Sequence, residues 1–450
     1  MPSKALEAKL KDYADVIATR NKIDPSLYAQ NNVKRGLRNE NGTGVLVGIT
    51  RVGEVNGYRK ENDVKIPIEG ELYYRGHNIK DLVAGFEKEH RLGFEEVVYL
   101  LLFGRLPTQA ELTDFNTILD NSRDLPLHYK EDVIIKIPAP NIMNKLQRAV
   151  LTLYSYDPTP DDISVLNVLR QSIELIAKLP LLAAYSYQVK RYAFHNESMV
   201  IHSPKKGIGT AANFLMLIRP DGKYTQEEVE ILDLLLVLQA EHGGGNNSSF
   251  ATHVVSSSGT DTYSAIATAL GALKGPKHGG ANKAVDEMVK DIKEHVKNPK
   301  DPIELKAYLQ KILNKEANDK TGLIYGLGHA VYTLSDPRAL ILKEHAERLA
   351  KKNGQEETYQ LLTQIETLGC ELINAKVRSD NRVSANVDFY AGFVLSMLGI
   401  PEELYTPIFA ISRIAGWSAH RLEQILDDKI MRPAYVTLSE HKPYTQLDKR

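Results

Sequence analysis

The chain contains a single cysteine, Cys370, so it cannot form an intrachain disulfide bond. Such scarcity of cysteine is typical of proteins that work in a reducing compartment. The formal net charge is −1, so no overall electrostatic field favours nucleic acid or an anionic membrane as a partner. Binding of an anion must instead depend on Arg and Lys side chains that gather locally.

Long apolar runs are also absent. The longest, such as Val97–Phe103, are far shorter than the roughly 20 residues that a membrane-spanning helix needs. The first residues are charged and lack the apolar core of a signal peptide, and Glu7, Asp12 and Asp15 argue against a transit peptide. We therefore expect a soluble cytoplasmic protein that has neither a membrane nor a nucleic acid as a partner.

The composition is otherwise that of an ordinary globular protein, with 43% apolar and 25% charged residues. A chain of 450 residues can bury a large core, and its length favours two domains over one. Apolar residues recur at helical spacing along most of the chain, whereas alternation that favours strands is confined to 45–49, 65–68 and 71–74. We expect a mainly α fold with a small N-terminal β element.

Helix starts are indicated by two kinds of pattern. Thr108 and Thr225 each begin a capping box, with Glu three residues later. Asp301-Pro302 and Asp336-Pro337 each place a proline at a first helical position, where its missing N–H costs nothing. There is no internal repeat, low-complexity tract or clear linker, so composition alone gives no domain boundary.

Three short segments each place one titratable side chain beside residues that break or cap a helix. They are 275–282, which contains His278, 326–331, which contains His329, and 386–390, which contains Asp388. Two imidazoles and a carboxylate so placed are the minimum set for removing a proton from carbon and stabilising the enolate. A helix beginning near residue 281 disfavours an imidazolium at His278. Taken alone, His278 is equally well interpreted as a capping or loop histidine.

Two arginines also stand out. Arg413 is the only charge in 407–419, inside a helix expected to begin at Thr406-Pro407. Burying a guanidinium without an anionic partner costs several kcal/mol, so it needs a carboxylate from the protein or from a substrate. Arg338 falls in the first turn of a predicted helix, where an anion could meet free backbone N–H groups, although a solvated arginine is the plainer interpretation. Arg432 alone suggests only a surface residue.

Several other chemistries lack their motifs. No Gly-x-Ser-x-Gly segment exists to supply a lipase-type nucleophile, and Gly326-x-Gly328 is not followed by the third glycine of a dinucleotide site. His242 precedes three glycines and His253 is near, but neither spacing matches a metal-ligand pattern. We expect no metal.

Taken together and in order, five segments resemble the citrate synthase family. They are 241–244, 275–282, 326–338, 386–392 and 412–413, and the flanking stretches 70–79 and 93–107 agree with them. The likeness extends from about Gly36 to Pro433. It implies a two-domain helical fold, with a large domain of residues 1–282 and 391–450 and a small mobile lid of residues 283–390.

The resemblance also implies residue roles. Asp388 matches the base that takes a methyl proton from acetyl-CoA, His278 the group that stabilises the enolate, and His329 the group that polarises the ketone of oxaloacetate. Four residues match those that hold the oxaloacetate carboxylates: His242, Arg338, Arg413 and Arg432. The last would come from the other subunit, since the family works as a dimer or a multiple of one. The citryl thioester is then hydrolysed.

The segment after His329 departs from the family pattern, because it lacks the usual Arg or Lys. The residues that would hold the CoA phosphates are therefore sought elsewhere, and the candidates are Lys274, Lys277, Arg378 and Arg382. Acetyl-CoA is expected as a co-substrate, and no other cofactor is expected.

Two alternatives remain open at this point. A 2-methylcitrate synthase would use propionyl-CoA, which differs by one methylene and so by only ~1–3 kcal/mol in a pocket. A helical scaffold without activity would be expected to have lost His278, His329 or Asp388, and all three are present.

Overall fold

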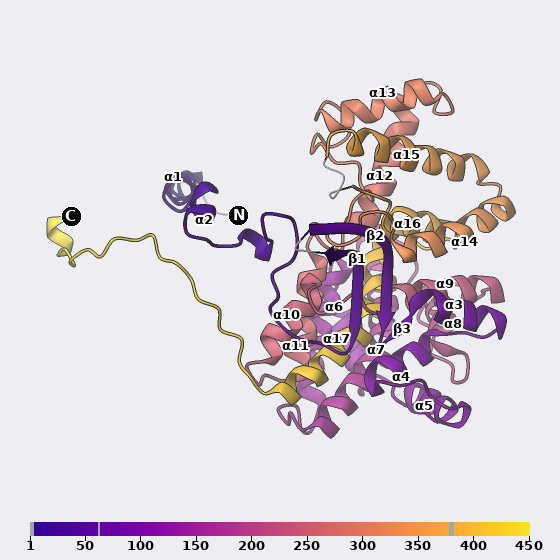
Figure 1. Cartoon of the computed structure of the whole chain (residues 1–450). Coiled ribbons are helices and arrows are strands. Elements are labelled where there is room, and N and C mark those ends of the chain that lie inside the picture. Colours follow the sequence, from indigo (N-terminus) through magenta and orange to yellow (C-terminus); the bar gives the residue numbers. More distant parts are fainter. Residues whose placement is uncertain (1–3, 62–63, 378–381) are drawn as a thin grey trace. The chain divides into compact units, whose positions relative to one another are not determined.

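The computed structural model describes residues 4–61, 64–377 and 382–450. The chain forms two compact units, one of Gly48–Met431 and one that joins Met1–Val47 to Arg432–Arg450. Regular structure in the described residues is almost entirely helical, with one small sheet (Figure 1). None of the described helices is both long and apolar enough to cross a bilayer. The predicted mainly α fold with a small β element near the start is confirmed.

The terminal unit contains α1 (Lys4–Arg20) and α2 (Ser26–Gln30). The main unit contains the other α-helices, which are α3 (Ile79–Lys88), α4 (Phe94–Phe103), α5 (Gln109–Asn121), α6 (Ile142–Leu153), α7 (Val165–His195), α8 (Gly209–Ile218), α9 (Gln226–Gln239), α10 (Asn247–Ser256), α11 (Thr262–Lys274), α12 (Ala281–His295), α13 (Pro302–Leu313), α14 (Pro337–Asn353), α15 (Glu356–Asn374), α16 (Val387–Met397) and α17 (Tyr405–Asp427).

The sheet has three antiparallel strands in the order β1-β2-β3. They are β1 (Gly53–Glu61), β2 (Val64–Tyr74) and β3 (His77–Asn78). The two strands predicted at 65–68 and 71–74 are parts of the single strand β2. The strand predicted at 45–49 is wrong, because these residues pair with no strand in the described part of the chain, and Leu46 and Ile49 are 94% and 96% exposed.

The helix-start signals are largely confirmed. Thr108 and Thr225 make complete capping boxes at α5 and α9. Asp301 and Asp336 cap α13 and α14, and both helices have proline in the first turn. The start of α17 differs from the prediction, because the short 3₁₀ turn at Glu402–Leu404 leads directly into a helix that begins at Tyr405, ahead of Thr406-Pro407.

The core of the main unit surrounds α17, which contacts α4, α7, α9, α10 and α11. A helix that is apolar all round is buried, and α17 is buried along almost its whole length. Its buried residues include Trp417, Ile414 and Arg413. Arg413, which is the only charged residue in the apolar stretch 407–419, therefore lies inside the protein.

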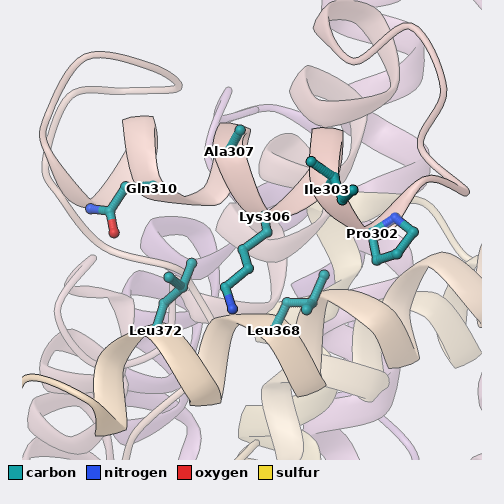
Figure 2. Close-up of a pocket in the computed structure, with 7 residues that line it drawn as sticks. All are labelled: Pro302, Ile303, Lys306, Ala307, Gln310, Leu368 and Leu372. Carbon is teal, nitrogen blue, oxygen red and sulfur yellow. The ribbon is translucent and has the colours of Figure 1, made fainter.

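Of the helices in the predicted lid, α12 and α14 pack on α16, while α13 packs on α15 at the top of the view (Figure 1). A hollow of about 470 Å³ lies between α13 and α15 (Figure 2). It is lined by residues such as Ile303, Lys306 and Leu372 and by none of the predicted site residues. The division into a large domain and a lid of 283–390 stays a prediction.

Candidate active site

A short backbone pairing joins the segments that carry His329 and Asp388. The N–H of Gly328 donates to Ser384 O (2.8 Å), and the N–H of Asn386 donates to Gly326 O (2.9 Å). Gly326 is required here, because its φ is +78° and a Cβ would lie 2.7 Å from the Phe389 ring. Two segments far apart in sequence are thereby held side by side.

Asn386 places Asp388 at the start of α16. Its side chain accepts from the Asp388 N–H (3.0 Å) and donates to Gly328 O (2.9 Å), so one residue both caps the helix and ties it to the His329 segment. Burial raises the pKa of the Asp388 carboxyl to about 6; Arg338 and Arg413 lower it and Asp336 adds to the rise. A carboxyl with that pKa can act as a base near neutral pH.

His329 has a defined tautomer. Its Nδ1 accepts hydrogen bonds from the backbone N–H groups of Val331 (3.0 Å) and Tyr332 (3.1 Å). In the neutral imidazole the proton must then be on Nε2. The ring stacks on Tyr332 (4.6 Å between centroids) and meets the edge of His242 (4.9 Å). His329 can therefore donate a hydrogen bond from Nε2.

Arg338 is buried and fully paired with Asp336. Its Nη2 and Nε donate to the two carboxylate oxygens at 2.7 Å and 3.0 Å. Burial acts to lower the pKa of Arg338, but Asp336 raises it above its ordinary value. Asp336 also caps α14 and accepts from the N–H of Val387 (3.2 Å), so it links the starts of α14 and α16.

Arg413 is buried with much less compensation. Its Nε donates to Gln239 O (2.7 Å), but within the described part of the chain Nη1 and Nη2 have no hydrogen-bond partner. The guanidinium lies 4.7 Å from the centre of the Phe409 ring. Burial lowers the pKa of Arg413 to about 10, and Glu241 opposes this effect. The side chain remains a cation with two donors unused.

His242 follows α9 and is also buried. Its Nε2 has no hydrogen-bond partner among the described residues. Burial, together with Arg338 and other nearby positive groups, holds the pKa of His242 well below its ordinary range. His242 is therefore a neutral imidazole that is surrounded by positively charged groups.

His278 lies in the turn between α11 and α12. Its Nε2 is 3.0 Å from the hydroxyl of Ser248, which accepts from Trp417 Nε1 (3.0 Å) and donates to Asn246 Oδ1 (2.9 Å). Burial, and then Arg413, lower the pKa of His278 to about 4. This agrees with the neutral imidazole expected from the sequence, although burial and Arg413 are the causes rather than the helix dipole.

These groups share one electrostatic environment. Arg413 lowers the pKa of Asp388, of His278 and of His242, and Arg338 lowers those of Asp388 and His242. The structure thus brings together six predicted site residues, namely His242, His278, His329, Arg338, Asp388 and Arg413. The arrangement combines a carboxylate base, neutral imidazole donors and buried cations, which suits proton removal from carbon beside an anionic substrate.

The remaining predicted residues lie outside this group. Lys274 and Lys277 are exposed at and after the end of α11, and Arg382 is exposed as well. Arg378 lies outside the described residues. Arg432 is exposed and belongs to the terminal unit. Their roles stay predictions.

Sequence patterns did not identify several residues that position this site. Asp336 was recognised only as part of a helix start, yet it pairs with Arg338. Tyr332 stacks on His329, and Ser248 contacts His278, but no local pattern marks either contact. Asn386 could have been found, because Asn two residues before Asp388 is an N-cap signal.

Comparison with known proteins places the chain in a family. A family model described as "Citrate synthase, C-terminal domain" matches residues 41–434. The citrate synthase of Synechocystis sp. is 34% identical, over 88% of this chain and 90% of its own length. The 2-methylcitrate synthase of Shewanella oneidensis is 33% identical, over 82% of this chain and 90% of its own length. The chain belongs to the citrate synthase family, and the predicted resemblance is confirmed.

The fold agrees with this assignment. A citrate synthase from the thermophilic archaeon Thermoplasma acidophilum has been solved in a ternary complex with carboxymethyl coenzyme A and oxaloacetate. It matches this structure with a TM-score of 0.75 at 27% identity, over 93% of this chain and 99% of that one. The chain therefore has the mainly helical fold of an enzyme family that catalyses a condensation.

Proposed function

We propose that this protein is a citrate synthase, which condenses acetyl-CoA with oxaloacetate and hydrolyses the citryl thioester to citrate and CoA. The observation that carries the proposal is a set of three buried nitrogen atoms, Arg413 Nη1 and Nη2 and His242 Nε2, that have no partner among the described residues. Buried polar groups are nearly always hydrogen-bonded. Such a set is expected where the carboxylates of a bound dicarboxylate complete the hydrogen bonds.

His329 fits the role of polarising the ketone of oxaloacetate. Its Nδ1 accepts from two backbone N–H groups, so the proton of the neutral ring is on Nε2. A hydrogen bond from Nε2 to the ketone oxygen draws electrons from the carbonyl carbon and stabilises the alkoxide that forms when carbon attacks. A preorganised donor of this kind is worth roughly 10²–10³ in rate.

Asp388 and His278 fit the roles of base and enol-stabilising donor. Asp388 takes a proton from the methyl group of acetyl-CoA while a hydrogen bond from His278 Nδ1 stabilises the developing enolate oxygen. This requires the Ser248 hydroxyl, which donates to Asn246 Oδ1 (2.9 Å) in this structure, to turn and donate to His278 Nε2 instead, which leaves the single proton of the neutral ring on Nδ1. A positioned base contributes roughly 10²–10⁴ in rate.

The enol carbon then bonds to the ketone carbon of oxaloacetate, and the hydrogen bond from His329 Nε2 stabilises the new alkoxide until it is protonated by water, while Asp388 returns its proton to solvent. Water adds to the thioester carbonyl and CoA leaves as the thiol, which makes the overall reaction effectively one-way. The acetyl group becomes an alkyl group on transfer, so the enzyme is an acyltransferase of the citrate synthase type. Closure of the predicted lid over both substrates excludes water until condensation is complete.

The proposal includes a homodimer in the cytoplasm, or a multiple of dimers, in which Arg432 reaches the site of the other subunit. The exposed side chains of Lys274, Lys277 and Arg382 are the proposed contacts of the CoA phosphates, with Arg378. Light scattering during gel filtration tests the dimer. Arg432→Ala is expected to raise KM for oxaloacetate while leaving the dimer intact.

A second candidate is 2-methylcitrate synthase, because relatives with that name cover most of this chain at similar identity. The test is thiol release from acetyl-CoA and from propionyl-CoA, each with oxaloacetate under matched conditions. We expect a higher kcat/KM with acetyl-CoA. A propionyl-CoA preference would move the assignment to 2-methylcitrate, and release from neither would contradict the proposed function.

A further inference from the structure

A chain of buried hydrogen bonds ends next to the group formed by His242 and Arg413. Gln424 Oε1 lies 2.9 Å from His253 Nδ1, His253 Nε2 lies 3.0 Å from His420 Nδ1, and His420 Nε2 lies 2.9 Å from Glu241 Oε1. His420 and Glu241 are completely buried. The chain joins α10 and α17 to the residue that directly precedes His242.

The two ends of this chain fix where the protons are. Gln424 Nε2 donates to Lys429 O (3.5 Å), so Gln424 Oε1 faces His253, whose Nδ1 must carry a proton. At the other end, Glu241 Oε1 accepts a hydrogen bond from the backbone N–H of Gly243, and the guanidinium of Arg413 interacts with the same side chain, so Glu241 is a carboxylate. His420 Nε2 must therefore donate to it.

The contact between His253 Nε2 and His420 Nδ1 is a hydrogen bond, so one of these two nitrogen atoms also carries a proton. Three protons on two imidazoles are one more than two neutral rings hold, so one ring is an imidazolium. His420 is the ring that lies beside carboxylates, with Nε2 2.9 Å from Glu241 and Nδ1 4.0 Å from Glu423, whereas His253 Nδ1 faces the neutral amide of Gln424. The extra proton is therefore on His420, which donates to Glu241 from Nε2 and to His253 Nε2 from Nδ1.

The groups around His420 are compatible with a positive charge. Glu423 Oε2 is 4.0 Å from His420 Nδ1 and has no hydrogen-bond partner among the described residues. Glu241 lies on the other side of the ring. Arg75, in the turn after β2, interacts with both carboxylates, and Arg413 interacts with Glu241. Two carboxylates thus face an imidazolium and two guanidinium groups.

The side chain of Glu241 is closely packed on two sides. A Cβ at Gly53 would lie 2.7 Å from Glu241 Cγ, and a Cβ at Gly416 would lie 2.3 Å from Glu241 Oε2, so the carboxylate is enclosed between β1 and α17. If His420 were neutral, Arg413 would be the main cation available to Glu241. Arg413 would then be less available to a substrate carboxylate.

We infer that His420 is a buried imidazolium and that His253 stabilises this state by accepting a hydrogen bond from His420 Nδ1. The positive charge of His420 then balances the negative charge of Glu241, so Arg413 stays available for the carboxylate of the substrate. His253 acts as a positioning residue, since it contacts neither substrate nor any reacting atom in this scheme. The inference about substrate rests on the proposed function, whereas the inference about the protons does not.

The direct test is a neutron crystal structure of the perdeuterated wild-type protein. We expect deuterium on both ring nitrogens of His420 and only on Nδ1 of His253. A single deuterium on His420 would overturn the inference. So would a metal ion bound at His253, His420 and Glu423, whose ligand atoms lie within 4.8 Å of one another, and elemental analysis of the same protein detects it.

The functional test compares His253→Leu with His253→Gln. Leu removes the acceptor, and KM for oxaloacetate is expected to rise about tenfold, equivalent to roughly 1.4 kcal/mol, with a much smaller change in kcat. Gln can accept from His420 and donate to Gln424, so it should restore KM to within about twofold, as expected if one hydrogen-bonded link is replaced by another. The control is His195→Leu at the exposed end of α7.

A packing role for His253 predicts a different pattern. In that case the Leu and Gln variants would change the melting temperature but would have the same KM for oxaloacetate as each other, and the inference would be wrong. If the wild-type protein released no thiol from acetyl-CoA, the proposed function would fail, but the neutron result would still decide the protonation of His420.

Discussion

The two halves of the site differ in how completely their polar groups are paired. The first half is formed by 326–338 and 384–388. In it, His329 Nδ1 accepts hydrogen bonds from two backbone N–H groups, Arg338 is paired with Asp336, and both the oxygen and the nitrogen of the Asn386 side chain are hydrogen-bonded. In the half formed by His242 and Arg413, three buried nitrogens have no partner within the described residues. The first half is preorganised by the protein, and the second depends on a ligand.

This difference separates two tasks. Proton removal needs groups whose positions and protonation states are set in advance, because such groups need no rearrangement as charge develops in the transition state. Binding of a dianion needs buried cations whose donors are not already used by protein carboxylates. We therefore predict that changes at Asp388 and Asn386 in the first half lower kcat and that changes at Arg413 and His242 in the second half weaken oxaloacetate binding.

The largest effect is expected from Asp388→Asn. Loss of the base should lower turnover by roughly 10²–10⁴, while the dissociation constant of oxaloacetate, measured by calorimetry, stays nearly the same. The matched control is Asp286→Asn, since burial also raises the pKa of that carboxyl, in α12, to about 6. The control should keep its turnover. Equal losses of binding and turnover in Asp388→Asn would mean that the residue is structural.

Arg413→Met is expected to weaken oxaloacetate binding by roughly 10²-fold, because charged hydrogen bonds contribute about 1.5–3 kcal/mol each. The melting temperature should not fall, since a buried cation with two unused donors is removed. Arg421→Met in the same helix is the control. The Arg421 guanidinium donates to Thr262, Ser256 and Thr260, so its loss should lower the melting temperature and leave binding unchanged.

The pH dependence of kcat/KM should report Asp388. Burial raises its pKa to about 6, so activity should fall about tenfold per pH unit below that value as the base becomes protonated. A carboxyl with a raised pKa also destabilises the fold increasingly as pH rises from its ordinary value to about 6. Asp388→Asn should therefore be more stable than wild type at pH 8 but not at pH 4. A flat kcat/KM profile between pH 5 and 7 would contradict this assignment.

The smallest effect is expected from Asn386→Ala, which removes the cap of α16. The free energy of unfolding should fall by about 1 kcal/mol, and kcat should fall as well, because Asn386 also ties Asp388 to the His329 segment. Thr225→Ala, which removes a cap of α9, is the control and should lower stability alone. Equal kcat values for the two variants would show that the tie has no catalytic role.

Local features of the chain were predictable because their causes are local. Capping boxes, proline at a first helical position and helical spacing depend on residues a few positions apart, and they identified α5, α9, α13 and α14. The apolar surroundings of Arg413 were visible in the same way. The predicted strand at 45–49 failed because a strand also needs a neighbour, which alternation does not reveal.

Contacts between distant segments were beyond such patterns. The pairing of Gly326 and Gly328 with 384–386, the contact between Ser248 and His278, and the two-histidine chain behind Glu241 all join residues on separate elements. Family resemblance identified which residues belong together, but not which of their atoms are already hydrogen-bonded. That distinction comes only from the folded structure.

A crystal structure with oxaloacetate bound tests the comparison most directly. We predict that the carboxylates accept hydrogen bonds from Arg413 Nη1 and Nη2 and from His242 Nε2, and that the Asp336 pair of Arg338 is retained. Oxaloacetate bound elsewhere, with those three nitrogens still without partners, would contradict the account.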